Sequence, residues 1–381
     1  MRTPTLVLIC IFATTAARAD TAPVIDTLRE DIVPQPSADI AVQVHESRRI
    51  DWVALPIPIS NPTIGSGLAV TTMALYHLGG AAQPSNTAVG VFKTDNGSSG
   101  AGVLQETYLG NTGWQINGAL LKANLNLDFF GVGADQGNQN KALPINQDIK
   151  GGAIWVMAAV APGFSLGPRY RFDTVDVRPE VDSQKLADFP VPLPPLNIGL
   201  TESTLELLLQ YDTRDSRFGP AQGWFTEFSA AFTDKAVGSD ITYQKYTLAA
   251  NWYYRLTPAL VLGLRGSLCE ASDSTPFFAL CLFGMSSDLR GYVTGRYRDK
   301  TMFATQAELR WHVWRRLGAV AFAGVGDVAE QFSDLKLSDP LSSVGAGLRF
   351  LASPQNRVNI GVDVAYAKND YTAYFRIGEA F

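Results

Sequence analysis

The segment that decides the fold is Arg357–Ala367, whose sequence is RVNIGVDVAYA. Its residues alternate in character along the chain. The apolar set is Val358, Ile360, Val362, Val364 and Tyr366, and the set between them is Asn359, Gly361, Asp363 and Ala365. Successive side chains of a β-strand point to opposite faces. The pattern therefore predicts a strand with one apolar and one polar environment.

The same alternation recurs elsewhere in the chain. Thr242–Tyr254 sets Tyr246, Leu248, Ala250, Trp252 and Tyr254 against Lys245, Thr247, Ala249 and Asn251. Met302–Trp314 sets Phe303, Ala307, Leu309, Trp311 and Val313 against Gln306, Glu308, Arg310 and His312. With the turn signals between segments, the pattern predicts sixteen strands. They are 50–59, 64–77, 86–95, 98–109, 113–128, 149–161, 164–177, 201–213, 223–234, 240–255, 258–269, 301–316, 319–330, 341–351, 357–367 and 371–381.

Composition limits the class of protein. Of the 381 residues 46% are hydrophobic, yet the mean hydropathy is only +0.03. A membrane-spanning helix needs about 20 consecutive apolar residues, and no such run follows the first stretch of the chain. Charged residues make up 18%, against roughly 25% in soluble domains. Two classes remain: a large soluble all-β protein and a transmembrane β-barrel.

Alternation alone does not separate these two classes, but three other features favour the barrel. Aromatic residues gather at strand ends beside arginines, in 252–255 and 311–316, as they do at membrane interfaces. Short links alternate with long loops, which we expect at 182–197, 271–300 and 331–340. The even strand number allows closure with both ends on one side. The predicted fold class is therefore an all-β, antiparallel transmembrane β-barrel of sixteen strands.

The N-terminus has the form of a secretory signal peptide. Arg2 is followed by the apolar run 6–13 and by the A-x-A site 17–19, which predicts cleavage after Ala19. An uncleaved anchor is the alternative, although it needs a longer apolar run. Residues 20–49 are then predicted to be a short periplasmic tether and 50–381 the barrel, located in the bacterial outer membrane. Loss of Arg2 and Arg18 changes the net charge from −5 to −7, which does not favour nucleic acid as a partner.

Two cysteines remain after signal removal, Cys269 and Cys281. In an exported protein a close pair is typical of a disulfide. The alternative is two unpaired thiols, because spacing does not prove the geometry.

Sequence motifs for catalysis are weak. Residues 163–167 read GFSLG and fit G-x-S-x-G, but a strand and not a helix is expected to follow, so the nucleophile elbow is not supported. His45, His77 and His312 lie far apart, without metal-ligand spacing. We expect no enzyme activity, no metal and no cofactor.

The most informative loop segment is Gly284–Tyr292, with the sequence GMSSDLRGY. An arginine followed by glycine and an aromatic residue suggests a guanidinium that fixes the loop to a wall, although an exposed loop arginine is the plainer alternative. Leu-Arg-Gly-Tyr at 289–292 resembles the tip of the sixth outer loop of Omp85 barrels, the BamA/TamA and surface antigen D15 superfamily.

Four further segments agree with this resemblance. Residues 211–215 (YDTRD) with Pro220 and Gly223 resemble a strand and turn of the family, and 56–68 resembles the barrel start of members without periplasmic domains. Glu308 resembles the glutamate on the strand after the loop. Residues 375–381 (FRIGEAF) resemble the C-terminal signal read by the barrel assembly machinery, through Phe375, Ile377, Gly378 and Phe381.

The resemblance implies that the long loop folds into the lumen and that Arg290, with Gly291 and Tyr292, anchors it against Glu308. The pairing is physically reasonable, because a charge in a confined lumen needs a partner. A second wall acid is expected from the family's F-x-D-x-G motif, but residues 322–326 read FAGVG, with Gly324 in the acid's place. Asp327 is nearby, and its parity puts it on the opposite face from Phe322.

The function implied is outer-membrane biogenesis or translocation, without catalysis. The alternatives are a passive pore or structural barrel with a constricting loop, and a secreted soluble β-domain or enzyme. The expected partners are outer-membrane lipids and the assembly machinery. The family's periplasmic POTRA domains are not found in this sequence, so a separate periplasmic partner is also considered.

Overall fold

A computed structural model describes residues 50–81, 85–139, 141–181, 197–217, 219–336, 338–354, 357–368 and 370–381. The predicted signal peptide (1–19) and tether (20–49) lie outside the described residues. So does nearly all of the loop predicted at 182–197.

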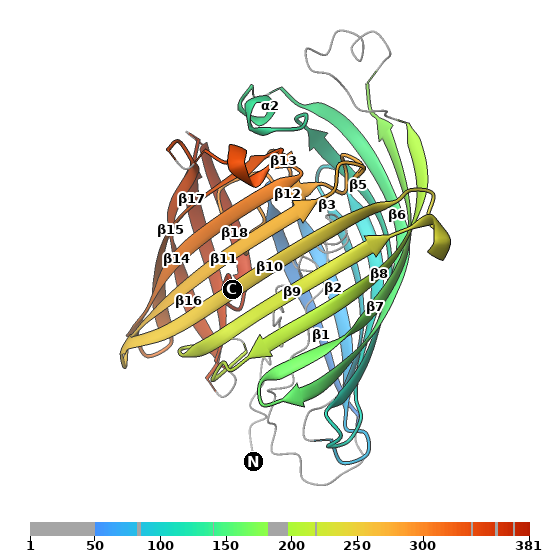
Figure 1. The fold of residues 1–381 in the computed structure, drawn as a ribbon. Helices are drawn as coiled ribbons and strands as arrows, with labels where there is room; N and C mark the ends of the chain where they lie inside the picture. The colour runs from blue at the N-terminus through green and yellow to red at the C-terminus, as the bar shows by residue number, and fades with distance from the viewer. Residues whose placement is uncertain are drawn as a thin grey trace.

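Sixteen strands of the described residues form one antiparallel sheet, in which each strand pairs with its neighbours in sequence order. Figure 1 shows this sheet curled into a barrel of tilted strands. The strands are β1 (Asp51–Asn61), β2 (Gly65–Tyr76), β3 (Ser85–Thr94), β4 (Ser99–Tyr108), β5 (Trp114–Phe129), β6 (Leu143–Ala161), β7 (Phe164–Pro179), β8 (Ile198–Asp212), β9 (Gly223–Thr233), β10 (Tyr243–Thr257), β11 (Leu260–Ala271), β14 (Thr301–Trp314), β15 (Leu317–Ala329), β16 (Leu341–Ser353), β17 (Val358–Ala367) and β18 (Asp370–Ile377).

The predicted fold class is confirmed, and most predicted strand bounds are correct within a few residues. Two differ more. β6 begins at Leu143 instead of 149, because polar residues that break the apolar pattern still pair across the sheet: Asn124 Nδ2 donates to Asn146 Oδ1 at 3.1 Å. β18 ends at Ile377 instead of 381, because Gly378 adopts a φ of +86° and turns the chain away from the sheet.

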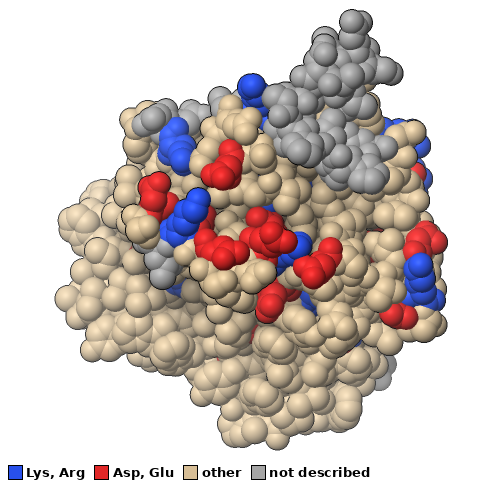
Figure 2. Space-filling model, turned by 45° about the horizontal axis from the view of Figure 1, so that its top comes forward, with Lys and Arg blue, Asp and Glu red and all other residues tan. Residues whose placement is uncertain are grey.

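The two ends of the barrel differ in their connections. We call one end the loop end; it carries the connections 62–64, 95–98, 234–242, 272–300 and 330–340. We call the other the turn end; it carries the connections 109–113, 162–163, 213–222, 258–259, 315–316 and 354–357. Short elements lie at the loop end: α2 (Ala134–Asn138), the 3-10 turns η1 (Lys235–Val237) and η2 (Phe332–Asp334), and the strand pair β12 (Cys281–Leu282) and β13 (Arg298–Asp299). Figure 2 shows lysine, arginine, aspartate and glutamate side chains gathered at this end.

The first and last strands lie side by side at the barrel seam. Ser60 Oγ donates to the carbonyl oxygen of Ala373 at 3.0 Å. Between the described residues of β1 and β18 there is no ladder of the kind that joins every other neighbouring pair. The seam is therefore the least hydrogen-bonded junction in the described sheet.

The two faces of the wall follow the predicted alternation. On β17, Val362 is 49% exposed, whereas Asp363 is 0% exposed. On β14, Leu309 and Trp311 are exposed outside, and Glu308 is buried inside. In a lipid environment the apolar side chains of this outer face would be removed from water. That transfer is favourable by roughly 1.5–3 kcal/mol for a large side chain. Among the described residues, no helix is long and apolar enough to cross a bilayer.

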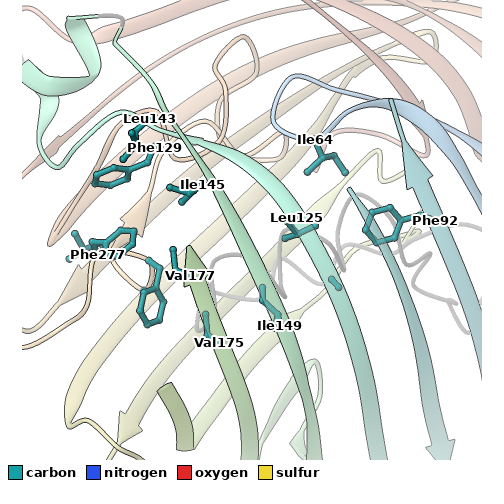
Figure 3. Close-up of a cluster of buried hydrophobic side chains, with 14 of the residues drawn as sticks. Ile64, Phe92, Leu125, Phe129, Leu143, Ile145, Ile149, Val175, Val177 and Phe277 are labelled. Carbon is teal, nitrogen blue, oxygen red and sulfur yellow. The ribbon is translucent and has the colours of Figure 1, made fainter. Parts of the chain in front are cut away.

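The connection 272–300 folds into the barrel. Phe277 and Phe278 pack in one buried apolar cluster with Phe129, Ile145 and Val177 of the β5–β7 wall. Figure 3 shows Phe277 among these wall residues. The Phe277 ring meets Phe129 edge-on at 5.0 Å between centroids. A disulfide joins Cys281 of this loop to Cys269 of β11. The apolar contact and the disulfide hold the first half of the loop and leave its tip to reach the opposite wall.

Candidate functional site: the arginine anchor of the lumen loop

The loop tip is buried inside the barrel. Leu289 and Arg290 are both 0% exposed. Gly291 follows with a φ of +112°, and a Cβ at that position would lie 2.9 Å from the Cβ of Ala367. Glycine is thus required twice here, by the backbone turn and by the close approach to β17. The turn delivers the Arg290 side chain to the β14–β17 wall.

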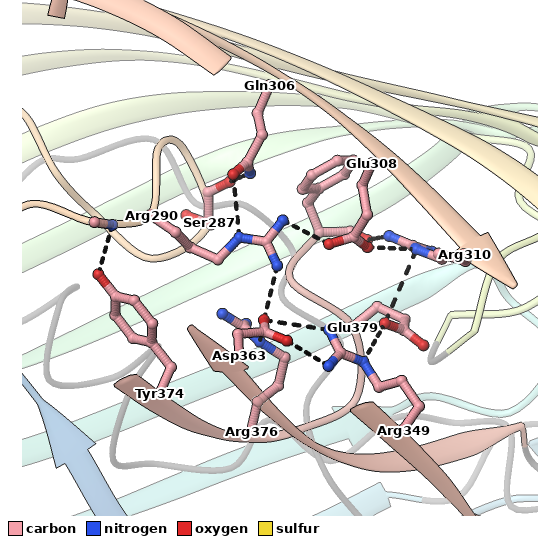
Figure 4. Close-up of polar contacts among 12 residues, drawn as sticks. Ser287, Arg290, Gln306, Glu308, Arg310, Arg349, Asp363, Tyr374, Arg376 and Glu379 are labelled. Carbon is pink, nitrogen blue, oxygen red and sulfur yellow. Dashed lines mark hydrogen bonds and ion pairs between the residues drawn. The ribbon is translucent and has the colours of Figure 1, made fainter. Parts of the chain in front are cut away.

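Arg290 is held between two carboxylates (Figure 4). Its Nη2 lies 2.5 Å from Glu308 Oε2 on β14, and its Nη1 lies 2.7 Å from Asp363 Oδ2 on β17. Its Nε donates to Gln306 Oε1 at 3.1 Å. The guanidinium also stacks on Phe322, 3.4 Å from the ring centroid. All three nitrogens of the guanidinium therefore have acceptors on the wall.

Burial and charge oppose each other at this arginine. Burial lowers the pKa of the Arg290 guanidinium, and the nearby Glu308 and Asp363 carboxylates act in the opposite direction. Desolvating a charge is expensive, and breaking such a buried pair costs about 3–5 kcal/mol when a charge is left without a partner. The arrangement favours a loop tip that stays docked as long as its carboxylates are present.

The loop backbone is fixed as well. The Gly291 N–H donates to Tyr374 Oη on β18 at 2.8 Å. The Ser343 hydroxyl on β16 donates to the carbonyl oxygen of Arg290. Tyr292 Oη donates to the carbonyl oxygen of Ser342 at 2.8 Å. The anchor thus joins the loop to β14, β16, β17 and β18 together.

The two carboxylates of the anchor belong to a wider network toward the turn end. Glu308 Oε1 accepts from Arg310 Nε at 2.7 Å. Asp363 accepts from Arg349 Nη1 at 2.5 Å and from Arg376 Nε at 3.0 Å. Arg349 Nε in turn donates to Glu379 Oε2 at 2.9 Å. Each acid that binds Arg290 therefore has other arginine partners.

The second acid of the anchor is Asp363, which replaces the aspartate expected at position 324. At that position Gly324 leaves room for the side chain of Leu289, which a Cβ would strike. Asp327 is directed elsewhere, since its Oδ2 accepts from the Lys336 N–H at 2.8 Å. A sequence signal for Asp363 existed, because the alternation placed it on the polar face. What the sequence did not show was that β17 faces the loop tip.

The other residues named from the sequence lie apart from the anchor. Phe375 and Ile377 are on β18, and Gly378 donates its N–H to the carbonyl oxygen of Asn359 at 2.7 Å. Phe381 is not on a strand. It is 4% exposed, inside the barrel near Tyr253 of β10, with ring centroids 6.4 Å apart.

The motifs considered for chemistry lie in turns and strand ends. Gly163 is in the turn between β6 and β7, and the strand β7 follows it from Phe164. His312 Nε2 contacts the carbonyl oxygen of Arg315 at 2.6 Å, at the turn end. Among the residues that the structure describes, no group of three or more His, Cys, Asp or Glu side chains is arranged to hold a metal ion.

Comparison with known proteins agrees with this geometry. The family model described as the Omp85 superfamily domain matches residues 117–381. The chain belongs to the Omp85 superfamily. This confirms the family that the loop-tip and strand motifs resemble. A search of curated protein sequences finds no match.

Solved structures of Omp85 barrels share the fold. BamA from Haemophilus ducreyi lacking POTRA domains 1–3 superposes with a TM-score of 0.59 at 14% identity, over 86% of this chain and 69% of that one. CdiB from Escherichia coli gives a TM-score of 0.58 at 10% identity, over 88% of this chain and 63% of that one. CdiB from Acinetobacter baumannii gives a TM-score of 0.55 at 9% identity, over 87% of this chain and 60% of that one. The Omp85 chain described here thus spans less than two thirds of either CdiB chain.

Proposed function

We propose that this Omp85 barrel lies in the bacterial outer membrane and works in membrane biogenesis or in translocation, without catalysis. Family membership supports the class, and one observation carries the proposal further. Loop 272–300 is held inside the barrel by Arg290, between Glu308 and Asp363. A simple diffusion pore has no need for a loop tip desolvated against two carboxylates, whereas a barrel that must stay closed until it acts does.

The seam is the second part of the proposal. Backbone groups without partners are costly in lipid, and β1 and β18 are the neighbours without a described ladder. Asp363 and Tyr374 lie on β17 and β18. Movement of the last strands would therefore disturb the anchor. On this proposal the docked loop keeps the barrel at rest, and the seam is where its wall opens.

The domain organisation follows from this placement. We propose that residues 1–19 are a cleaved signal peptide, that 20–49 are a periplasmic tether, and that 50–381 form the barrel. The turn end then faces the periplasm and the loop end the exterior. Phe375, Ile377, Gly378 and Phe381 are proposed as the segment read by the assembly machinery during insertion.

Planar-bilayer recording tests the closed lumen. The wild-type barrel is expected to show little steady conductance, and Arg290→Ala to show larger and more frequent openings because the loop tip is released. Arg178→Ala is the matched control, since Arg178 is an exposed arginine on β7. A large, steady conductance of the wild type would favour a passive pore instead.

The biological role needs a separate test. In a strain lacking the gene, at least one other outer-membrane or exported protein should fall in abundance. Wild type should restore it, and Arg290→Ala should restore it less. An unchanged membrane proteome in the deletion strain would contradict the biogenesis role and leave the fold assignment intact.

A further inference from the structure

A basic cavity lies at the turn end, below the anchor and next to the β14–β17 wall. Its volume is about 170 Å³, far above the roughly 15 Å³ that holds one water. Arg310, Arg316, Arg349 and Arg357 line it, and Glu379 is the one carboxylate among the lining residues that the structure describes.

Glu379 is held by Asn359 and by two of the lining arginines, Arg349 and Arg310. Its Oε1 accepts from Asn359 Nδ2 at 2.6 Å, and its Oε2 accepts from Arg349 Nε at 2.9 Å. Arg316 lies at the cavity with an exposed side chain that makes no hydrogen bond or ion pair with any described residue. The cavity therefore presents a guanidinium that the described residues leave available.

The surrounding charges also favour an anion. The four lining arginines belong to, or lie beside, a wider ion-pair network that, with Arg316 added, contains seven arginines and four side-chain carboxylates; Arg310 Nη2 also donates to the Phe381 oxygen at 2.7 Å. The arginines are Arg255, Arg290, Arg310, Arg316, Arg349, Arg357 and Arg376, and the carboxylates are Asp215, Glu308, Asp363 and Glu379. A cleft lined by one sign of charge concentrates oppositely charged groups.

Among the connections between strands at the turn end, charged residues occur on one side. The connections 77–84, 109–113 and 162–163, on the opposite side, contain no lysine, arginine, aspartate or glutamate. By contrast, 213–222, 315–316 and 354–357 together contain five arginines and one aspartate. A ligand drawn by charge would therefore approach beneath β14–β17 and not beneath β2–β7.

We propose that this cavity binds the carboxylates of an acidic polypeptide segment. Guanidinium groups match carboxylates in geometry and can bind them through paired hydrogen bonds. This inference rests on the proposed function, in which the turn end faces the periplasm, so the acidic segment is expected to come from that side. Two sources share the chemistry: a separate periplasmic protein, and residues 20–49 of this chain, which hold six acidic residues and three arginines.

A lipid headgroup fits the cavity less well. Arg310 and Arg349 are buried on the inner side of the wall, where they bind Glu308 and Asp363. The exposed apolar side chains at this level, including Trp314 and Leu317, are on the outer surface. A phospholipid would meet that outer surface before it met the two buried arginines.

Fluorescence anisotropy with a labelled octaglutamate peptide tests the site, using the full chain folded in a zwitterionic detergent. We expect saturable binding that weakens as salt rises, with octaglutamine as the uncharged comparison. Arg316→Glu should weaken binding at least tenfold, and its exposed position leaves the fold intact. Arg178→Glu, a reversal on an exposed strand residue outside the cavity, should leave binding within twofold of wild type.

A second variant separates the two sources. Asp26→Asn, Glu30→Gln and Asp31→Asn are combined in the full chain. If residues 20–49 fill the cavity, this change removes an internal competitor, and octaglutamate should bind several-fold more tightly. Unchanged affinity assigns the cavity to a separate partner. Either result supports the site.

Three results would overturn the proposal. Octaglutamate could bind no better than octaglutamine. Arg316→Glu could have no larger effect than Arg178→Glu. Short-chain phosphatidylglycerol, and not octaglutamate, could show the dependence on Arg316, which would assign the cavity to lipid. None of these results changes the conductance expected from a plugged lumen, so failure here is distinct from failure of the proposed function.

Discussion

Replacing Arg290 by alanine is the sharpest test of the anchor. The change removes a guanidinium that contacts Glu308, Asp363 and Gln306. Hydrogen bonds to charged groups contribute about 1.5–3 kcal/mol each, but both acids keep other arginines. The penalty for an uncompensated charge is therefore avoided. We expect the docked loop to lose about 2 kcal/mol, which is roughly a thirtyfold change in its undocking equilibrium.

Hydrogen exchange followed by mass spectrometry measures this quantity directly. Loop peptides that cover 284–300 should exchange roughly thirtyfold faster in Arg290→Ala, and the peptides of β14 and β17 should change much less. Combining Arg290→Ala with Glu308→Ala closes a double-mutant cycle. Because Arg290 and Glu308 are in direct contact, their coupling is expected to be about 1–2 kcal/mol.

The network also predicts an order among the acids. Asp363→Ala leaves three arginines without their shared carboxylate, whereas Glu308→Ala leaves two. Asp363→Ala should therefore destabilise the barrel more, by about 3 kcal/mol or more. Additive effects of Arg290→Ala and Glu308→Ala within about 0.5 kcal/mol, or unchanged loop exchange in Arg290→Ala, would refute this account of the anchor.

Three further changes probe the loop and the turn end. Tyr374→Phe removes the hydroxyl that accepts the loop backbone N–H and should loosen the tip by about 1 kcal/mol, measured by exchange of the same peptides with Tyr211→Phe as control. Cys281→Ser breaks the loop disulfide and should lower stability by about 2–4 kcal/mol in urea titrations. The third change concerns Asp215. Partial burial raises the pKa of its carboxyl, but the Ala221 N–H and the Arg357 guanidinium outweigh burial and hold that pKa below its usual range. The Asp215 carboxylate therefore stabilises the 213–222 turn at pH values above the ordinary aspartate pKa. This stabilisation is lost as the pH falls through the lowered pKa of Asp215. Proteolysis of the turn should show that acid dependence in wild type and not in Asp215→Asn.

Each of these has a result that counts against it. Equal exchange in Tyr374→Phe and Tyr211→Phe would show that the backbone bond does not hold the tip. Labelling of Cys269 or Cys281 in the unreduced protein, located by peptide mapping, would exclude the disulfide. A turn whose proteolysis follows pH equally in wild type and in Asp215→Asn would show that this carboxylate does not hold it.

The anchor was partly predictable because its two nearest members carry local signals. Arg290 stands in a short motif, and Glu308 lies on the polar face of an alternating strand. Asp363 carried the same parity signal but no motif, and 73 residues separate it from Arg290. The contact depends on how far the loop crosses the lumen, which alternation along a strand does not encode.

The sequence by itself predicted sixteen strands in a transmembrane barrel and the faces of the alternating segments 242–254, 302–314 and 357–367. These properties follow from period-two alternation and short turns, which are local in the chain. Only the tertiary structure decided which wall the loop tip meets, that Asp363 takes the second acid's place, and that residues 378–381 turn inward. The physical reason is that these contacts join groups far apart in sequence, and their partners are chosen by barrel closure and by the burial of charge.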